Sequence, residues 1–182
     1  NAAPFPKLDI GLQKTDTPLG PVEFIFFWGR VDESDYFDAD PANNHNLFSG
    51  TAIGWAPSFA PGLTVGLNRT ALSAWENLEP SSLLTVFSSD FQNTDMGKDE
   101  QDQRASVTFD WLFPSVGFNA YAEWARNDYS PELRDNILLE PSHSQAYTVG
   151  ARQYVYLFEQ EFLVEGEINQ LESSKSWLIN GI

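Results

Sequence analysis

The stretch from Arg104 to Asn127 alternates apolar and polar residues with a period of two. In Ala105–Phe113 (ASVTFDWLF) and in Phe118–Trp124 (FNAYAEW), apolar side chains fall on one face of an extended strand and polar side chains on the other. Pro114–Gly117 between them has the composition of a tight turn. The stretch therefore predicts a β-hairpin with one apolar face, one polar face and carboxylates at mid-strand.

The same pattern predicts strands along the rest of the chain. They are expected at Lys7–Lys14, Val22–Val31, Leu47–Ala56, Leu63–Trp75, Gln145–Tyr156 and Glu161–Leu171, with one more starting in Ser176–Ile182 and a short helix in Pro80–Phe87. No repeat of fixed period and no low-complexity linker divides the sequence. We therefore expect residues 1–182 to form a single domain, or a fragment of one.

Composition excludes several classes of protein. The chain has 26 acidic and 10 basic residues and a net charge of −16, so we expect no nucleic-acid partner, because phosphate contacts need clustered Lys and Arg. It has no cysteine, which excludes disulfides and cysteine-based metal sites. No apolar run reaches the roughly 18 residues of a membrane helix, which excludes a helical membrane protein.

Short turns and long polar loops alternate along the chain, which is typical of outer-membrane barrels. Aromatic residues also gather at the strand ends. Trp55, Phe59, Trp111, Phe113, Phe118, Tyr154, Tyr156, Phe158 and Phe162 flank short turns, and Trp28, Phe48, Trp75, Trp124 and Tyr147 lie toward long loops. Two such girdles are expected at membrane interfaces. Strands of about ten residues, tilted by about 40°, also span the ~25 Å of a barrel's apolar band.

We therefore predict an all-β fold, an antiparallel up-and-down transmembrane β-barrel or a section of a larger one. Its short turns are expected to be periplasmic and its long loops extracellular. The alternative is a soluble β-sandwich, whose strands also alternate.

Five motifs give the chain a resemblance to a known family. They are Glu33–Asp38 (ESDYFD), Leu47–Gly50 (LFSG), Pro61–Arg69 (PGLTVGLNR), Glu123–Asp128 (EWARND) and Leu133–Gly150 (LRDNILLEPSHSQAYTVG). In this order they resemble the capsule assembly Wzi family of bacterial outer-membrane proteins. The resemblance implies a large barrel in the bacterial outer membrane, in contact with outer-membrane lipid. It also implies lectin-like, non-catalytic binding of capsular or other surface polysaccharide. Family members have more strands, so the chain is expected to be an internal section of the barrel.

The polar strand faces predict a charged lumen. Its expected members are Arg104, Asp110, Glu123, Arg152, Glu165 and Glu167. One interpretation is a salt-bridged filling of the barrel, because buried charges need partners. The other is a polar conduit or a sugar-binding lining. Glu165 and Glu167 share a face and suggest an acid/base pair, but adjacent carboxylates on a solvated wall are far commoner, so no enzyme activity is expected.

Sugar binding requires aromatic faces beside planar hydrogen-bonding groups. The candidates in or near the outer loops are Tyr36, Asn43, Asn44, Trp75, Tyr129 and Arg134. An alternative role for Trp75 and Tyr129 is membership of the aromatic girdle.

The acidic loop Asp32–Asp40 suggests calcium, but it lacks the residue order of an EF-hand. His45 and His143 are expected to stand alone. We therefore predict no metal and no cofactor. The function predicted is the anchoring of surface polysaccharide, and the alternatives are a porin-type diffusion channel and a soluble carbohydrate-binding sandwich.

Overall fold

The computed structural model describes residues 5–33, 44–75, 78, 80, 83, 101–127 and 145–171. These residues form one eight-stranded sheet. Its strands are β1 (Lys7–Thr15), β2 (Val22–Asp32), β3 (His45–Trp55), β4 (Leu63–Ala74), β5 (Gln101–Phe113), β6 (Phe118–Asn127), β7 (Gln145–Leu157) and β8 (Gln160–Leu171), with a single-turn 3-10 helix, η3 (Pro114–Val116), between β5 and β6.

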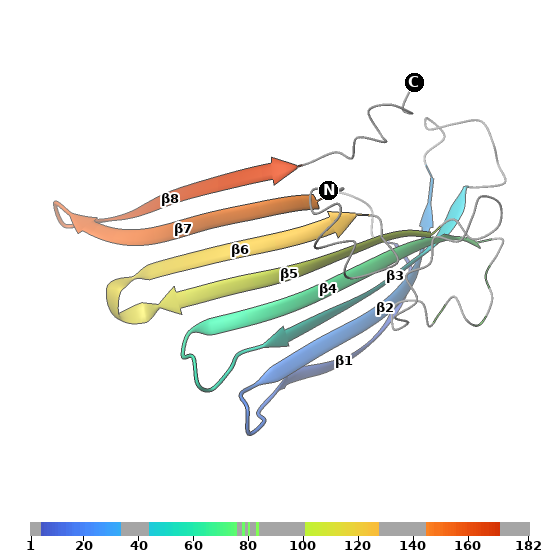
Figure 1. The fold of residues 1–182 in the computed structure, drawn as a ribbon, viewed down its shortest axis with the longest axis horizontal. Coiled ribbons are helices and arrows are strands. Elements are labelled where there is room, and N and C mark those ends of the chain that lie inside the picture. The colour runs from blue at the N-terminus through green and yellow to red at the C-terminus, as the bar shows by residue number, and fades with distance from the viewer. Residues whose placement is uncertain are drawn as a thin grey trace, which may run out of the picture.

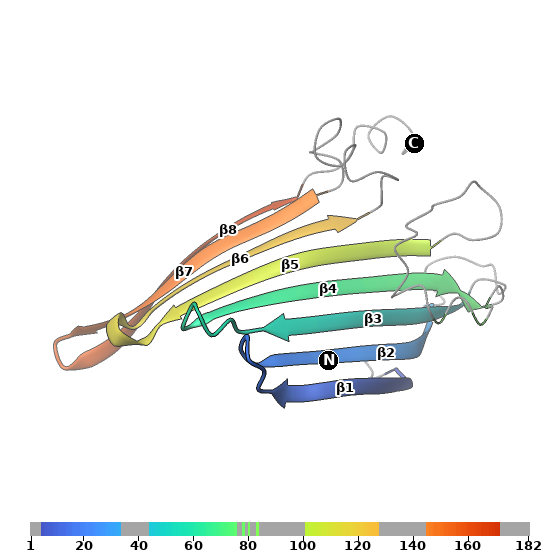
Figure 2. The ribbon, with the colours of Figure 1, turned by 60° about the horizontal axis from the view of Figure 1, so that its bottom comes forward.

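Each strand pairs in antiparallel fashion with its neighbours in sequence, in the order β1 to β8 (Figures 1 and 2). This confirms the predicted all-β, up-and-down topology, and the predicted strands lie within a few residues of the observed ones. The described strands include no pairing between β1 and β8, which form the two edges of a curved sheet (Figure 2). β5 begins at Gln101, before the hairpin expected from Arg104, while Ser176–Ile182 lies outside the described residues.

Left-handed backbone conformations close the short turns. Gly117 follows η3 with a φ of 63°, a conformation that glycine adopts without steric cost, as expected for the Pro114–Gly117 turn. In the two-residue turn between β7 and β8, Phe158 and Glu159 have φ values of 52° and 63°. A type I′ hairpin turn requires positive φ at both positions, and its twist matches that of the strands.

The register of the sheet sorts the side chains onto an apolar face and a polar face. Val107, for example, is in register with Leu67 and Trp124, whereas its neighbour Thr108 is in register with Gly66 and Glu123. The apolar face carries large exposed side chains on seven of the eight strands, among them Leu8, Ile10, Leu12, Ile53, Leu67, Phe109, Trp111, Trp124, Val149, Phe162, Val164 and Ile168. On β2 the large exposed apolar side chain is Ile25, and the register places it on the polar face. Contiguous apolar surface on this scale marks contact with a membrane or another apolar surface.

The strands are staggered along the sheet. Leu63, the first residue of β4, is in register with Trp111 of β5, and that row continues through Ala120 and Ala151 to Gly166 of β8. β8 therefore extends from Gly166 to Gln160 past the end of β4, and Figure 1 shows the short turns stepping outward from β1–β2 to β7–β8. Such a stagger accompanies the strand tilt that barrels require.

Few side chains are buried. Leu47, Ser49, Ala71 and Ser73 are buried on the apolar face near the long-loop end of β3 and β4. Beside them the Trp28 indole Nε1 donates to the Leu83 carbonyl at 2.9 Å. Among the described residues, the core is therefore confined to this end of the sheet.

Three aromatic residues of the expected girdles lie on the polar face. The register places Tyr154 and Tyr156 there, and also Phe48, whose ring packs against Phe27 and Phe5 at centroid distances of 5.3 and 5.9 Å. Their placement follows from strand parity, because nearness to a strand end does not determine which face a side chain occupies. The girdle prediction is therefore wrong for these three residues.

Two glycines of adjacent strands provide a matched test of this packing. A Cβ on Gly150 would lie 2.3 Å from the Tyr121 ring, whereas a Cβ on Gly166 would meet nothing within 4 Å. We expect Gly150→Val to lower the free energy of unfolding by about 1–3 kcal/mol because of overpacking. Gly166→Val should show no such loss in urea unfolding under the same solvent conditions, and equal midpoints for the two variants would contradict the packing described.

Candidate functional site

The six charged residues of the predicted lumen all lie on the polar face. Arg152 and Glu165 are directly opposite in register, and the Arg152 Nε donates to Glu165 Oε1 at 2.7 Å. This ion pair is the charge-to-charge contact that strand alternation predicted. Both side chains are close to half exposed, so its contribution to stability is small.

Tyr121 joins the two neighbouring carboxylates of β8. Its hydroxyl lies 3.1 Å from Glu165 Oε1 and 2.6 Å from Glu167 Oε2, and donates to one of them at a time. The Asn169 amide also donates to Glu167, at 2.7 Å. The Arg152 guanidinium lies over the Tyr121 ring at 4.7 Å. We call Tyr121, Arg152, Glu165, Glu167 and Asn169 the β6–β8 network.

The other predicted lumen residues lie outside this network. Asp110 accepts a hydrogen bond from the Asn119 amide at 2.9 Å. Glu123 is exposed, in register with Thr108 and Thr148. Arg104 lies opposite Thr70 and Asn127. Sequence reasoning identified the charges but missed Tyr121, Asn119 and Asn169, which supply most of the hydrogen bonds. The available sequence signal was that these three residues share the polar face with the predicted charges.

The polar face is hollowed over β1 to β5. A groove of about 610 Å³ is lined there by residues including Asp9, Gln13, Glu23, Thr64, Asn68 and Thr108. Gly11, Gly54 and Gly66 are also part of its lining. Neighbouring atoms lie close over them, and a Cβ on Gly66 would lie 2.2 Å from Thr108 Oγ1. The polar groups of this lining are of the kind that hydrogen-bond hydroxyls or water.

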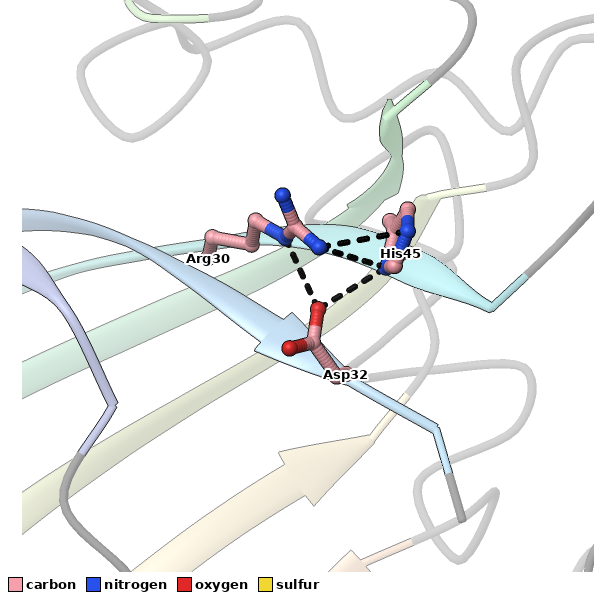
Figure 3. Close-up of polar contacts among 3 residues, drawn as sticks. All are labelled: Arg30, Asp32 and His45. Carbon is pink, nitrogen blue, oxygen red and sulfur yellow. Dashed lines mark hydrogen bonds and ion pairs between the residues drawn. The ribbon is translucent and has the colours of Figure 1, made fainter. Parts of the chain in front are cut away.

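A second polar cluster lies at the long-loop end of β2 and β3 (Figure 3). Asp32 Oδ1 accepts hydrogen bonds from Arg30 Nε and His45 Nδ1, both at 2.8 Å. Arg30 Nη2 also lies 3.2 Å from His45 Nε2. The side chains of Arg30, Asp32 and His45 are 39%, 59% and 46% exposed, so the cluster is open to solvent.

This cluster contains the described part of the predicted sugar site. The Arg30 guanidinium lies 5.8 Å from the centre of the Trp75 ring. The Asn44 carbonyl accepts a hydrogen bond from the Glu33 backbone at 2.8 Å. The strands thus bring Trp75 and Asn44 to the same end of the sheet. The remaining predicted contacts, Tyr36, Asn43, Tyr129 and Arg134, lie outside the described residues.

The expectation that His45 stands alone is wrong. The β2–β3 register pairs His45 with Asp32 across the strands, and Arg30 lies two residues before Asp32 on the same face. The sequence does indicate this pair, because Asp32 ends one strand and His45 begins the next across a single loop. It was missed because Asp32 was assigned to the acidic loop.

The Arg30 guanidinium, and after it the His45 ring, holds the pKa of Asp32 below its usual range. This carboxylate lies at the strand end, beyond the last apolar residue of its face on β2, Trp28. Among the described residues, no three His, Asp or Glu side chains form a group that could hold a metal ion. Most of the acidic loop proposed for calcium lies outside the described residues.

Comparison with known proteins finds no matching family, no matching curated protein and no matching solved structure. Within the part of the chain that the structure describes, no helix has the length and apolar character needed to cross a bilayer.

The cluster makes a specific prediction about titration. Because the pKa of Asp32 is lowered, its stabilising contribution is present above the usual carboxyl pKa and is lost as pH falls through the lowered value. We expect Arg30→Gln to raise the pKa of Asp32 more than His45→Gln does, because Arg30 is the stronger cause. Carboxyl-carbon NMR of 13C-labelled aspartate measures both shifts. A larger effect of His45→Gln would contradict the geometry.

Proposed function

We propose that this chain is a section of an outer-membrane β-barrel that binds and anchors surface polysaccharide without catalysis. The main support for a barrel is the apolar face, which extends over eight staggered strands and exposes large side chains. In lipid this face needs no second layer of protein, and a closed barrel leaves no unpaired backbone. A soluble sandwich needs a second sheet over the same face, and the described residues form one sheet.

The strand edges support a section of a larger barrel. β1 and β8 each have one paired side within the described sheet. Their outer edges therefore carry backbone groups that a membrane environment requires to be paired. Further strands on either side satisfy this requirement, in agreement with the larger barrel that the family resemblance implies.

Polysaccharide binding is supported by the cluster at the long-loop end. Trp75 offers an apolar ring face, and Arg30, Asp32 and His45 offer charged and hydrogen-bonding groups beside it. This combination suits a pyranose ring with its hydroxyls. The carboxylates suggested for acid/base chemistry, Glu165 and Glu167, are instead engaged by the β6–β8 network, which favours a non-catalytic role.

A diffusion channel is the second candidate, and the groove on the polar face favours it. In a barrel this groove faces the lumen, where Glu23 contributes a negative charge and Asp9 is paired with Lys7 at 3.1 Å. Single-channel conductance in planar bilayers distinguishes the two roles. An anchoring protein with a filled lumen gives no steady conductance, whereas a channel does.

Trp75 and Trp111 provide a matched pair of variants for the binding role, because both lie on the apolar-face side at opposite ends of the strands. We expect Trp75→Ala to weaken binding to an array of capsular polysaccharides by about tenfold, on the order of 1 kcal/mol for a lost aromatic contact. Trp111→Ala should leave binding unchanged. The barrel is checked separately by heat-modifiable gel migration. Equal binding by both variants would contradict the assignment of the sugar site.

A further inference from the structure

A row of four residues in register crosses the groove on the polar face. Glu23 of β2 is opposite Gly54 of β3, Gly54 is opposite Gly66 of β4, and Gly66 is opposite Thr108 of β5. All four residues line the groove, and we call them the glycine row. The row places a carboxylate and a hydroxyl on either side of two glycines, with about 14 Å, three strand spacings, between the outer backbones.

The two outer side chains of the glycine row extend inward over the glycines. A Cβ on Gly54 would lie 3.1 Å from Glu23 Oε1, and a Cβ on Gly66 would lie 2.2 Å from Thr108 Oγ1. The carboxylate and the hydroxyl therefore converge above one pair of opposite glycines. A ligand that lies across this row meets an acceptor on one side and a group that both donates and accepts on the other.

Several polar groups of the groove are left unused by the protein. Within the part of the chain that the structure describes, four side chains of the lining make no hydrogen bond or ion pair: Gln13, Glu23, Thr64 and Thr108. The β6–β8 network differs, because there Glu165 and Glu167 accept hydrogen bonds from neighbouring side chains. The polar groups of the groove are thus available to a ligand.

The charge of the groove disfavours an anionic ligand. Among the described residues that line it, the charged ones are Asp9 and Glu23, and Lys7 pairs with Asp9 at 3.1 Å. Glu23 is left as a negative group that accepts hydrogen bonds and donates none. It repels carboxylates and phosphates, and it favours a ligand that presents hydroxyl groups.

A small apolar surface adjoins the glycine row on the side of the long loops. Ile25 of β2 and Ala52 of β3 are opposite in register and line the groove there. The groove volume of about 610 Å³ lies within the range of about 300–1,000 Å³ that is usual for small-molecule sites. Polar groups beside an apolar surface suit the hydroxyls and the C–H face of a sugar ring, and this volume admits a short oligosaccharide.

We propose that the groove binds a short, uncharged oligosaccharide across the glycine row. Glu23 accepts hydrogen bonds from sugar hydroxyls, and such charge-assisted bonds are stronger than neutral ones. The Thr108 hydroxyl holds the opposite side of the ligand, and Ile25 contacts the C–H face of a ring. Gln13 and Thr64 add further hydrogen-bonding groups within the same lining.

This site goes beyond the proposed function. The register places Arg30, Asp32 and His45, which belong to the proposed polysaccharide site, on the opposite face of the sheet from the groove. The groove requires neither lipid contact nor the sugar contact at Trp75. It is therefore a second saccharide site, selective for uncharged sugars.

The test uses the full chain, folded in lauryldimethylamine oxide, because this detergent has no sugar headgroup. Isothermal titration calorimetry measures the binding of three neutral probes, maltotriose, cellotriose and triacetylchitotriose, and of acidic trigalacturonate. The proteins compared are the wild type, E23A/T108V and E161A/T148V. The last variant removes the same two kinds of group from the polar face of β7 and β8, away from the groove.

We expect at least one neutral trisaccharide to bind the wild type with a Kd of about 1 mM or tighter. E23A/T108V should bind it about tenfold or more weakly, because hydrogen bonds on both sides of the ligand are lost. E161A/T148V should bind like the wild type. Trigalacturonate should bind the wild type about tenfold or more weakly than the neutral sugar, because Glu23 repels its carboxylates.

Equal binding by E23A/T108V and the wild type overturns the groove site. The absence of binding by every neutral probe up to about 10 mM also overturns it. If E23A/T108V does not fold, trigalacturonate binding to the wild type as tightly as the neutral sugars overturns it instead.

Trp75→Ala separates the groove from the proposed polysaccharide site. If this variant loses trisaccharide binding while E23A/T108V retains it, the probe occupies the long-loop end and the groove site is wrong. Binding of capsular polysaccharides by the wild type and Trp75→Ala reports separately on the proposed function, so the two failures are distinguished.

Discussion

The backbone hydrogen bonds between neighbouring strands are the interaction on which this structure depends. Within the described residues the buried apolar side chains are Leu47 and Ala71, so side-chain packing contributes little over most of the sheet. A sheet held mainly by its backbone ladder and exposing apolar residues on every strand lacks the hydrophobic burial that stabilises soluble domains. In the barrel that we propose, lipid supplies that missing apolar environment. On this proposal, the large side chains of the apolar face, such as Phe109 and Ile168, contact the bilayer while the backbone ladder holds the strands together.

The polar face follows from the same constraint. Strand alternation that places every second residue on the apolar face places the others on the opposite side, where the sheet is hollowed. A groove lies over β1 to β5, while the β6–β8 network places paired polar groups on the rest of this face. The long-loop end adds Trp75 and the Arg30, Asp32 and His45 cluster. The apolar face, the polar face and the exposed polar end are the three features from which we propose a barrel that anchors polysaccharide.

The period-two pattern predicted the strands, their order and the sharing of one face by six charged residues. These properties depend on local alternation and short turns, which the sequence displays directly. The alternation of faces along a strand does not by itself show which residue a charged side chain pairs with. The Asp32–His45 pair required the β2–β3 register, and the roles of Tyr121 and Asn169 required the distances across three strands. Phe48, Tyr154 and Tyr156 were assigned by nearness to strand ends, whereas register decides their face.

The central claim is that the apolar face contacts lipid. Trp28, Trp55, Trp111 and Trp124 lie on this face and serve as natural probes. We would reconstitute the full chain into phosphatidylcholine vesicles with brominated acyl chains and record tryptophan fluorescence. Bromine quenches tryptophan fluorescence on contact, so we expect strong quenching relative to unbrominated vesicles. Replacing Trp111 and Trp124 together with phenylalanine should remove the largest part of this quenching. Fluorescence that is unaffected by bromine would mean that protein covers this face, and the barrel would be wrong.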